Sequence, residues 1–336
     1  MPQIVALSTV DAQARFERLP PALRIASLSP VFAAADARRD PLLRCVHAGL
    51  DDGDSVWLHS VHLRPLAGAS DQWAATSPYG YGGPVTTLTD PTALAQAWSA
   101  WQDWCRQGDV LAEFCRFHPQ LPDATRAFGG VMRDNRKTVS VDLLVPDLAA
   151  NFNSLTRRKI RRAREAGVQA RWTQQPADWA AFPAFYRAAM QDMQASTFYF
   201  FSDAYFEALS QLACARLLVC ECDGRWLSAG VYLEGAGVIE YHLGASHPEG
   251  KALGTPSLLQ AEAAAWGRAQ GAHSLYLAGG TDPSPDNPLL FYKLGFSRRT
   301  LPFSVGEAIH DDNRYWAVAA RLGFDRAHPP PRLLLD

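Results

Sequence analysis

The stretch from Val238 to Phe296 constrains the fold more than any other part of this sequence. It contains an alternating strand pattern, a loop with glycines, an apolar helix pattern, a second strand pattern and a Gly-Gly turn, in that order. A strand that runs into such a loop at the start of a helix leaves backbone N–H groups without intrahelical partners. We therefore expect this stretch to bind phosphate or the carbonyl oxygen of an acyl group.

The helix of this stretch is predicted to run from about Pro256 to Gln270. Proline is tolerated in the first turn, where its missing N–H has no intrahelical partner to lose. Leu259, Ala263 and Trp266 recur at helical spacing and form an apolar stripe. Gly271 then supplies a residue that can adopt a left-handed cap.

The strand before this helix is predicted from Val238 to Leu243, and the segment Gly244 to Pro256 that follows it is predicted to be a loop. Tyr241 and Leu243 alternate with Glu240 and His242, so one face is apolar and the other polar. Glu240 and His242 are our candidates for a group that accepts a proton from an attacking amine. Each is equally interpretable as a strand residue that faces a polar cleft.

Composition excludes several classes of protein. The chain has 336 residues, 48% of them hydrophobic, and a net charge of −2, which predicts a large core and no global attraction to nucleic acid or anionic membrane. Neither the nine histidines nor the six cysteines show a metal-ligand spacing, so we expect no metal and no resident cofactor. We find no long apolar stretch and no signal-peptide pattern, and we therefore expect a cytoplasmic protein without a membrane span.

A pattern in the first half of the chain recurs in the second half. A helix pattern that ends at Gly108, a strand pattern and Pro119 are matched by the helix pattern that ends at Gly271, a strand pattern and Pro283. The two glycines are 163 residues apart and the two prolines 164 residues apart, close to half the chain. This repeat indicates a duplicated domain, with predicted boundaries at residues 1–150 and 151–336.

A strongly basic run opens the predicted second domain. Six of the eight residues from Arg157 to Arg164 are Arg or Lys. Cations at this density repel one another at helical spacings, so a contact with phosphate or carboxylate would stabilise them. We predict that Arg157 and Arg161 bind an anionic substrate, and the alternative is a solvated helix face.

The first half contains a second candidate binding loop, Ser77-Pro-Tyr79-Gly-Tyr81-Gly-Gly-Pro84. Its glycines permit close approach of a ligand to the backbone, and its two tyrosines offer aromatic faces and hydroxyls. We predict that Ser77, Tyr79 and Tyr81 bind the acceptor, the alternative being a plain glycine-rich turn. Arg116, at the end of the next strand, could bind a phosphate through two parallel hydrogen bonds or form a structural ion pair.

The second half closes on Phe291-Tyr292-Lys293-Leu-Gly-Phe296. The order of patterns from Val238 onwards resembles the core of the GNAT acyltransferase superfamily, and Tyr292-Lys293-Leu-Gly-Phe296 resembles the aromatic-Lys-x-x-Phe pattern of its Fem-type (FemAB-like) aminoacyltransferase branch. The loop from Ser77, the sequence Arg116-Phe-His-Pro119, the basic run and Gly279-Gly280 also resemble Fem-type segments. The resemblance covers about residues 75 to 305.

The resemblance implies an α+β protein of two tandem GNAT-like domains, each a mixed sheet flanked by helices. The first domain would carry the acceptor-binding loop, and the second would bind the acyl donor and catalyse transfer. In Fem-type proteins the lysine of the pattern stabilises charge on the acyl group or on the phosphate of the donor, which makes Lys293 and Tyr292 the expected catalytic pair. Tyr241, Gly254, Gly279 and Gly280 would contact substrate.

Two departures from the ordinary GNAT pattern affect the expected donor. Phe291 stands where acetyl-CoA enzymes carry a tyrosine acid, and Pro256 stands where they carry a glycine whose N–H binds pyrophosphate. We therefore expect aminoacyl-tRNA as donor and an amine acceptor such as a peptidoglycan precursor or a small peptide. The alternatives are an acyl-CoA-dependent N-acyltransferase and a non-catalytic module that binds glycan precursors.

Overall fold

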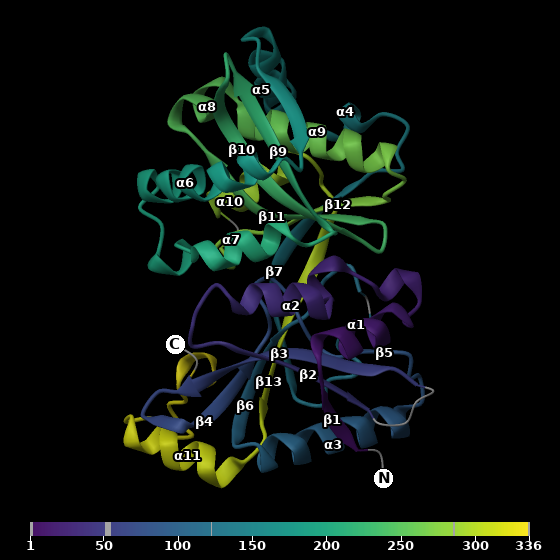
Figure 1. The fold of residues 1–336 in the computed structure, drawn as a ribbon, viewed down its shortest axis with the longest axis vertical. Helices are drawn as coiled ribbons and strands as arrows, with labels where there is room; N and C mark the ends of the chain where they lie inside the picture. Colours follow the sequence, from purple (N-terminus) through teal and green to yellow (C-terminus); the bar gives the residue numbers. More distant parts are fainter. Residues whose placement is uncertain (1–2, 51–54, 122, 285, 335–336) are drawn as a thin grey trace. The chain divides into compact units, whose positions relative to one another are not determined.

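The computed structural model describes residues 3–50, 55–121, 123–284 and 286–334, and the chain divides into two compact units. The first unit contains Met1–Asn135 and Phe303–Asp336, and the second contains Arg136–Pro302. Each unit is a mixed β-sheet flanked by helices, which confirms the predicted α+β class with two tandem domains of this architecture (Figure 1).

The first unit has the strand order β1-β2-β3-β4-β6-β13. Its β4 and β6 are parallel, the other neighbours are antiparallel, and the short β5 pairs with β3. The elements are β1 (Ile4–Leu7), α1 (Thr9–Glu17), η1 (Pro21–Leu23), η2 (Ala26–Leu28), α2 (Pro30–Ala37), β2 (Arg44–Leu50), β3 (Trp57–Leu66), β4 (Ala69–Thr76), β5 (Val85–Thr86), α3 (Pro91–Gln107), β6 (Val110–Arg116), β13 (Thr300–Ile309), α11 (Asp312–Arg321) and η4 (Pro331–Leu334).

The second unit has the strand order β7-β12-β11-β10-β9-β8. Its β11 and β12 are parallel, and the other neighbours are antiparallel. The elements are β7 (Val131–Asp142), α4 (Leu148–Asn151), α5 (Ser154–Glu165), β8 (Gln169–Thr173), α6 (Pro176–Asp192), η3 (Thr197–Tyr199), α7 (Asp203–Ser210), β9 (Ala215–Cys222), β10 (Arg225–Gly235), β11 (Val238–Ser246), α8 (Pro248–Leu253), α9 (Thr255–Ala269), β12 (Ser274–Gly279) and α10 (Pro288–Leu294).

The two units share one topology, because β1, β2, β3, β4 and β6 of the first correspond in order and direction to β8, β9, β10, β11 and β12 of the second. The final strand of each sheet is exchanged. The strand that follows β6 in sequence is β7, and it pairs with β12, whereas β13, which follows β12, pairs with β6. The duplication seen in the sequence is therefore a duplication of fold.

This exchange explains why the compact units differ from the predicted division at residues 150 and 151. Residues 136–150 lie in the second unit, and residues 303–336 lie in the first. Both unit boundaries fall inside a strand, β7 or β13, rather than in a linker. A sequence search for linkers cannot detect such a boundary, because a strand that crosses it has an ordinary strand composition.

Helix α9 forms the centre of the core of the second unit. Its buried Leu258, Leu259 and Ala263 pack with Leu218 and Cys220 of β9. Helix α5 packs beside α9. Helix α6 contacts β11, and helix α7 contacts β9 (Figure 1). The observed bounds of α9 agree with the predicted helix to within a residue at each end, and Leu259 and Ala263 are buried as the stripe requires.

The predicted loop from Gly244 to Pro256 is wrong. Strand β11 continues to Ser246, and α8 (Pro248–Leu253) occupies most of the remaining segment. His247 caps α8 by accepting a hydrogen bond from the Glu249 N–H, and Pro248 occupies its first turn, so the start of this helix follows ordinary capping rules.

Candidate active site

Strands β11 and β12 separate partway along their length. Their parallel pairing runs from Val238 and Ser274 to Glu240 and Tyr276, although β11 continues to Ser246 and β12 to Gly279. In the first unit, the matching strands β4 and β6 stay paired to Thr76 and Phe114. An opening between parallel strands leaves backbone donors and acceptors for a ligand. Within the described residues, this opening is a property of the second unit.

Both strands carry a β-bulge where they separate. On β11 the partners of Val231 and Tyr232 are Leu243 and Tyr241, so His242 is an additional residue opposite β10. On β12, Leu277 is the additional residue opposite β7, and the next residue, Ala278, has a positive φ of 60°. Bulges of this kind re-aim side chains and are frequent next to active sites. The simple alternation predicted for β11 therefore ends at His242.

Lys293 lies at the end of β12. It is on α10, its side chain is 6% exposed, and its Nζ donates a hydrogen bond of 2.6 Å to the carbonyl of Gly279. Burial, together with the charge of Arg136, lowers the pKa of Lys293 from 10.5 to about 7. An amine in this state can act as a cation at neutral pH and titrates within the physiological range.

Arg136, on β7, holds the next carbonyl of the same turn. Its Nη1 donates a hydrogen bond of 2.8 Å to Gly280 O. Asn287 packs so closely on Gly280 that a Cβ there would lie 2.5 Å from Asn287 Oδ1, which explains the glycine. The Oδ1 atom of Asn287 also accepts the N–H groups of Leu289 and Leu290 at the start of α10. The Gly-Gly turn, α10 and Lys293 are thus fixed as one structure.

Tyr292 and Tyr241 belong to the packed interior of the second unit. The Tyr292 hydroxyl donates to Pro256 O at 2.7 Å, and its ring packs edge-on against Phe296 at 5.3 Å. Burial raises the pKa of Tyr292 well above its ordinary value of 10 and that of Tyr241 to about 12. Both phenols are therefore weak acids, and the geometry of Tyr292 supports a structural contribution to the start of α9.

Of the two proton-acceptor candidates on β11, Glu240 is 4% exposed and lies at the last paired position with β12. His242 is partly exposed at the bulge, and its Nε2 lies 2.6 Å from the Tyr205 hydroxyl. Both residues thus lie where the two strands separate. Their chemical roles remain predictions.

Gly254 joins α8 to α9 with a positive φ of 89°. A Cβ at this position would lie 2.6 Å from the carbonyl oxygen of Lys159 on α5, so helix packing by itself requires glycine here. The N–H of Gly254 is bonded to Gly250 O and that of Ser257 to Gly254 O, while Pro256 has no N–H. The start of α9 therefore offers fewer free donors than the sequence predicted.

The arginines of α5 make specific contacts within the second unit. Arg157 donates to Phe152 O at 2.6 Å, and Arg161 pairs with Glu165 at 3.6 Å while remaining 70% exposed. Arg162 donates to Ala252 O at the end of α8, and Arg164 binds Glu262 of α9. These contacts support the structural alternative for part of the run. Binding of an anion by Arg157 and Arg161 stays a prediction.

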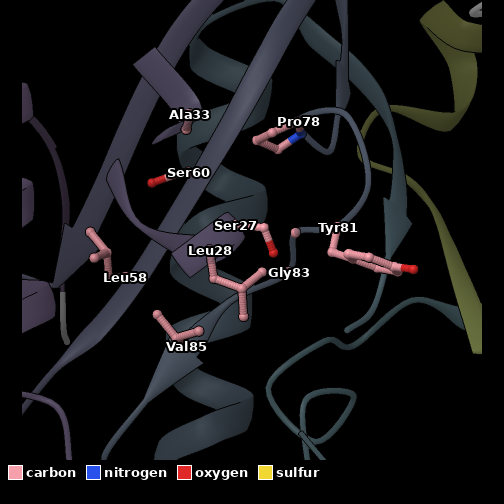
Figure 2. Close-up of a pocket in the computed structure, with 10 residues that line it drawn as sticks. Ser27, Leu28, Ala33, Leu58, Ser60, Pro78, Tyr81, Gly83 and Val85 are labelled. Carbon is pink, nitrogen blue, oxygen red and sulfur yellow. The ribbon is translucent and has the colours of Figure 1, made fainter. Parts of the chain in front are cut away.

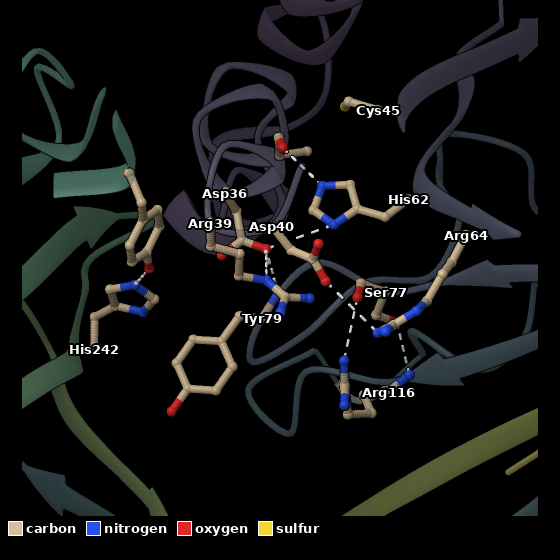
Figure 3. A network of polar contacts seen from close by, with 12 residues as sticks. Asp36, Arg39, Asp40, Cys45, His62, Arg64, Ser77, Tyr79, Arg116 and His242 are labelled. Atoms are coloured by element: carbon tan, nitrogen blue, oxygen red, sulfur yellow. Dashed lines mark hydrogen bonds and ion pairs between the residues drawn. The ribbon is translucent and has the colours of Figure 1, made fainter. Parts of the chain in front are cut away.

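In the first unit, Ser77 anchors the predicted acceptor loop. Its Oγ accepts the Arg116 N–H at 2.9 Å, and Arg116 Nη2 donates to Ser77 O at 3.2 Å (Figure 3). The backbone N–H of Tyr79 donates to the buried Asp36 at 2.7 Å. Tyr81 is 9% exposed and packs edge-on against His118 at 4.6 Å. The loop is therefore a packed structure, with Tyr79 more exposed than Tyr81.

A small cavity lies beneath this loop. It measures about 10 Å³ and is lined by residues that include Ser27, Leu28, Ser60, Tyr81 and Gly83 (Figure 2). A volume of this size holds about one water molecule. A substrate that binds this loop must therefore contact its outer surface, where Tyr79 is accessible.

Three residues of the site were not predicted from the sequence. Asn287 precedes Pro288, a cap followed by a first-turn proline, so its capping role could have been recognised. Arg136 joins the site only because β7 pairs with β12, and Tyr205 only because α7 packs beside β11. Neither contact has a local sequence signal. In the described part of the chain, no cluster of His, Cys, Asp and Glu has a metal-binding arrangement.

Comparison with known proteins bears on the fold and on part of the chain. Residues 150–311 match the family model of the acetyltransferase (GNAT) domain. None of the curated proteins compared with the sequence matches it. No helix in the described ranges has the length and apolar character needed to cross a bilayer.

Several solved structures are similar over nearly the whole chain. FemX superposes with a TM-score of 0.70 at 12% identity, covering 93% of this chain and 98% of FemX. The C-terminal domain of a putative lysylphosphatidylglycerol synthetase from Agrobacterium fabrum gives 0.62 at 12% identity, covering 94% and 96%. A tandem GNAT protein from the clavulanic acid biosynthesis pathway gives 0.51 at 14%, covering 91% and 98%. Residues 150–311 thus match a GNAT acetyltransferase domain, and the chain as a whole shares the fold of FemX.

Proposed function

We propose that this protein transfers an aminoacyl group from aminoacyl-tRNA to an amine acceptor, such as a peptidoglycan precursor or a small peptide. The observation that carries the proposal is the position of Lys293. Its buried amine lies at the end of β12, against Gly279 O, next to the point where β11 and β12 separate. A cation in a desolvated opening stabilises negative charge that develops on a nearby carbonyl oxygen.

The reaction proceeds by direct attack of the acceptor amine on the ester carbonyl of the donor. The C–N bond forms and negative charge accumulates on the carbonyl oxygen, where the Lys293 ammonium stabilises it. Glu240 or His242 accepts the proton of the attacking nitrogen. The C–O bond to the ribose of the donor then breaks, and the departing oxygen takes up a proton.

The start of α9 supports aminoacyl-tRNA over acyl-CoA as the donor. The N–H groups of Gly254 and Ser257 are engaged within the chain, and Pro256 contributes none. A pyrophosphate at this helix start would therefore find few of the donors that normally bind it. Acyl-CoA stays the second candidate, because the matching family model is that of an acetyltransferase domain.

The proposal is tested by incubating the protein with a labelled aminoacyl-tRNA pool and a cell extract, and in parallel with labelled acyl-CoA. The expected result is a labelled amide product that forms with the tRNA donor and is lost in Lys293→Met. Transfer from acyl-CoA alone would replace the donor assignment. Ligand binding without any transfer would instead support the non-catalytic module.

A further inference from the structure

Asn287 joins the turn at the end of β12 to α10, the helix that carries Lys293. Its side chain is 2% exposed. Its Oδ1 accepts the backbone N–H groups of Leu289 and Leu290 at 3.0 and 3.1 Å. Because a backbone N–H can only donate, these two contacts identify the oxygen of the amide, and the other atom is the Nδ2 donor. The orientation of the Asn287 amide therefore follows from its partners.

The nitrogen of the same amide holds the turn. Nδ2 of Asn287 donates to Thr281 Oγ1 at 2.7 Å and to Asp282 Oδ2 at 2.8 Å. Hydrogen bonds from the Ser284 N–H and then from Asn287 lower the pKa of Asp282 below its ordinary value of 3.8. Asp282 is therefore ionised at neutral pH, and an ionised carboxylate is a strong acceptor for the Asn287 amide.

Helix capping does not by itself explain an asparagine at this position. Aspartate caps a helix about as well as asparagine does, and the helix dipole favours its charge. A carboxylate at position 287 would accept the same two N–H groups, but it would lie about 2.8 Å from the Asp282 carboxylate and could not donate to it. An amide accepts from the helix with one atom and donates to the turn with the other.

The position of Lys293 depends on how α10 and this turn are held together. Nζ of Lys293 donates to Gly279 O at 2.6 Å, so the lysine also links the helix to the end of β12. Its side chain is long and flexible, whereas the buried Asn287 amide is short. Without the amide contact, the distance between α10 and the turn would depend more on the lysine itself.

We propose that Asn287 is a positioning residue, which sets where the Lys293 ammonium lies by holding the turn with Nδ2 while Oδ1 caps α10. This inference rests on the proposed acyl transfer, in which Lys293 stabilises charge on the acyl oxygen. A misplacement of about 1 Å can reduce a rate roughly a hundredfold, so a small shift of α10 is enough to change turnover.

Exchanging the donor and the acceptor tests this inference. Asn287→Asp keeps the cap and loses the donor, so turnover should fall roughly tenfold or more while the KM for the acceptor stays within about twofold. Asn287→Asp combined with Asp282→Asn places the donor on the turn and the acceptor on the helix. Turnover should then return to within about threefold of wild type, because the two changes compensate.

Asn153→Asp is the matched control. Asn153 caps α5 of the same unit, where its Oδ1 accepts the Thr156 N–H at 2.8 Å, and the substitution adds the same charge as Asn287→Asp. Since aspartate retains the cap, turnover should stay within about twofold of wild type.

The titration of Lys293 provides a second measurement that does not require transfer. Asp282→Ala removes the anchor from the exposed turn and leaves the residues of α10 unchanged. Loss of a negative charge by itself would lower the pKa of Lys293, whereas release of the turn admits water and raises it from about 7 towards 10.5. In protein with ¹³C-labelled lysine, the Lys293 signal, assigned by its loss in Lys293→Met, should show this rise.

The inference is overturned if Asn287→Asp is as active as Asn153→Asp, or if the double variant is no more active than the single one. A Lys293 pKa that is unchanged or lowered in Asp282→Ala overturns it as well, and this measurement decides if Asn287→Asp does not fold. If the pKa rises as expected but no donor supports transfer, the proposed function fails and the positioning of Lys293 by Asn287 stands.

Discussion

At the scale of single residues, burial of the Lys293 ammonium group is unfavourable for folding. Its buried Nζ donates to the Gly279 carbonyl, and burial, with the nearby charge of Arg136, disfavours the charged form and lowers the pKa of Lys293 to about 7. A side chain whose charge is unfavourable in the folded state is a candidate for binding or chemistry. Stability and activity should therefore respond in opposite directions when Lys293 is replaced.

Lys293→Met should reduce turnover about a hundredfold or more without lowering the melting temperature. The folded pKa of about 7 lies below the unfolded value of 10.5, so the unfolded chain binds more protons between these pH values and wild-type stability rises across them. Any gain in stability from Met should be largest below pH 7 and shrink towards pH 10.5. Thermal unfolding measured against pH, beside transfer assays, tests both statements. A folded variant with turnover within threefold of wild type would remove Lys293 from the mechanism.

Arg136→Met should raise the pKa of Lys293, because the positive charge of Arg136 is one of the two effects that lower this pKa. If the protonated amine is the active form, turnover falls as the pH rises through this pKa, and the falling limb should move to higher pH in the variant. Lys137→Met is the matched control. It removes an exposed charge from the neighbouring position of β7, whose side chain points to the other face. Equal shifts in the two variants would show that general charge, and not the position of Arg136, sets the pKa.

At the scale of elements, the junction of α8 and α9 is shaped by helix α5. Gly254 is required both by its positive φ and by the Lys159 carbonyl that lies against it. Gly167, just after α5, also has a positive φ, 77°, yet no atom lies within 4 Å of the position of its Cβ. Comparing substitutions at Gly167 and Gly254 therefore separates the energetic cost of backbone strain from the cost of contact with α5.

Gly167→Ala should destabilise the protein by roughly 1–2 kcal/mol, the cost of a left-handed residue that carries a Cβ. Gly254→Ala should destabilise it by clearly more, because α5 must also move. Chemical denaturation gives both values. Equal losses of stability would mean that α5 does not restrict this junction, and the glycine would then be available to a substrate.

The exposed arginines of helix α5 would attract an anionic donor. Replacing Arg157 and Arg161 with Ala should weaken binding of a tRNA donor and flatten its dependence on salt, since fewer counterions are released. Replacing Arg164, which is paired with Glu262, serves as the comparison and should change the slope less. Filter binding over a range of salt concentrations measures the slopes, and an unchanged slope would identify the run as a solvated face.

At the scale of the whole molecule, two copies of one topology have diverged. In the second unit β11 and β12 separate, whereas in the first unit the Ser77 loop bonds to the end of β6. The first unit also buries Glu113, whose carboxylate accepts from Trp101 at 2.8 Å and lies 2.6 Å from His59 and 3.3 Å from His310. These four residues join β3, α3, β6 and the end of β13.

Glu113 should make the first unit sensitive to acid. Burial raises its pKa, but the charges and hydrogen bonds of His59 and His310 outweigh burial and hold the pKa well below 4.5. A depressed pKa adds stability above the unfolded value that is lost as the pH falls below it. Glu113→Gln should therefore be less stable at neutral pH and lose less stability than wild type below pH 4.5. Hydrogen exchange in the strands of the first unit would measure this, and parallel pH curves for the two proteins would refute it.

Several local elements could be predicted from the sequence. Helix α9, strand β12 and the repeat between the halves follow from periodicity, proline placement and glycine caps, which act over a few residues. The lysine pattern at Tyr292-Lys293 likewise lies within one short segment. These features are readable because the physical interactions that produce them are local.

Three features could not be predicted from the sequence: the exchange of β7 and β13, the place where β11 and β12 separate, and the contacts of Arg136 and Tyr205. Each depends on packing between segments far apart in the chain, and a strand has the same composition whichever sheet it joins. The helix α8 in place of the predicted loop is a different case, because its cap, His247 followed by Pro248, is a local signal that the sequence already contains. The contact of Gly254 with the Lys159 carbonyl of α5 likewise joins distant segments, and no local pattern predicts it.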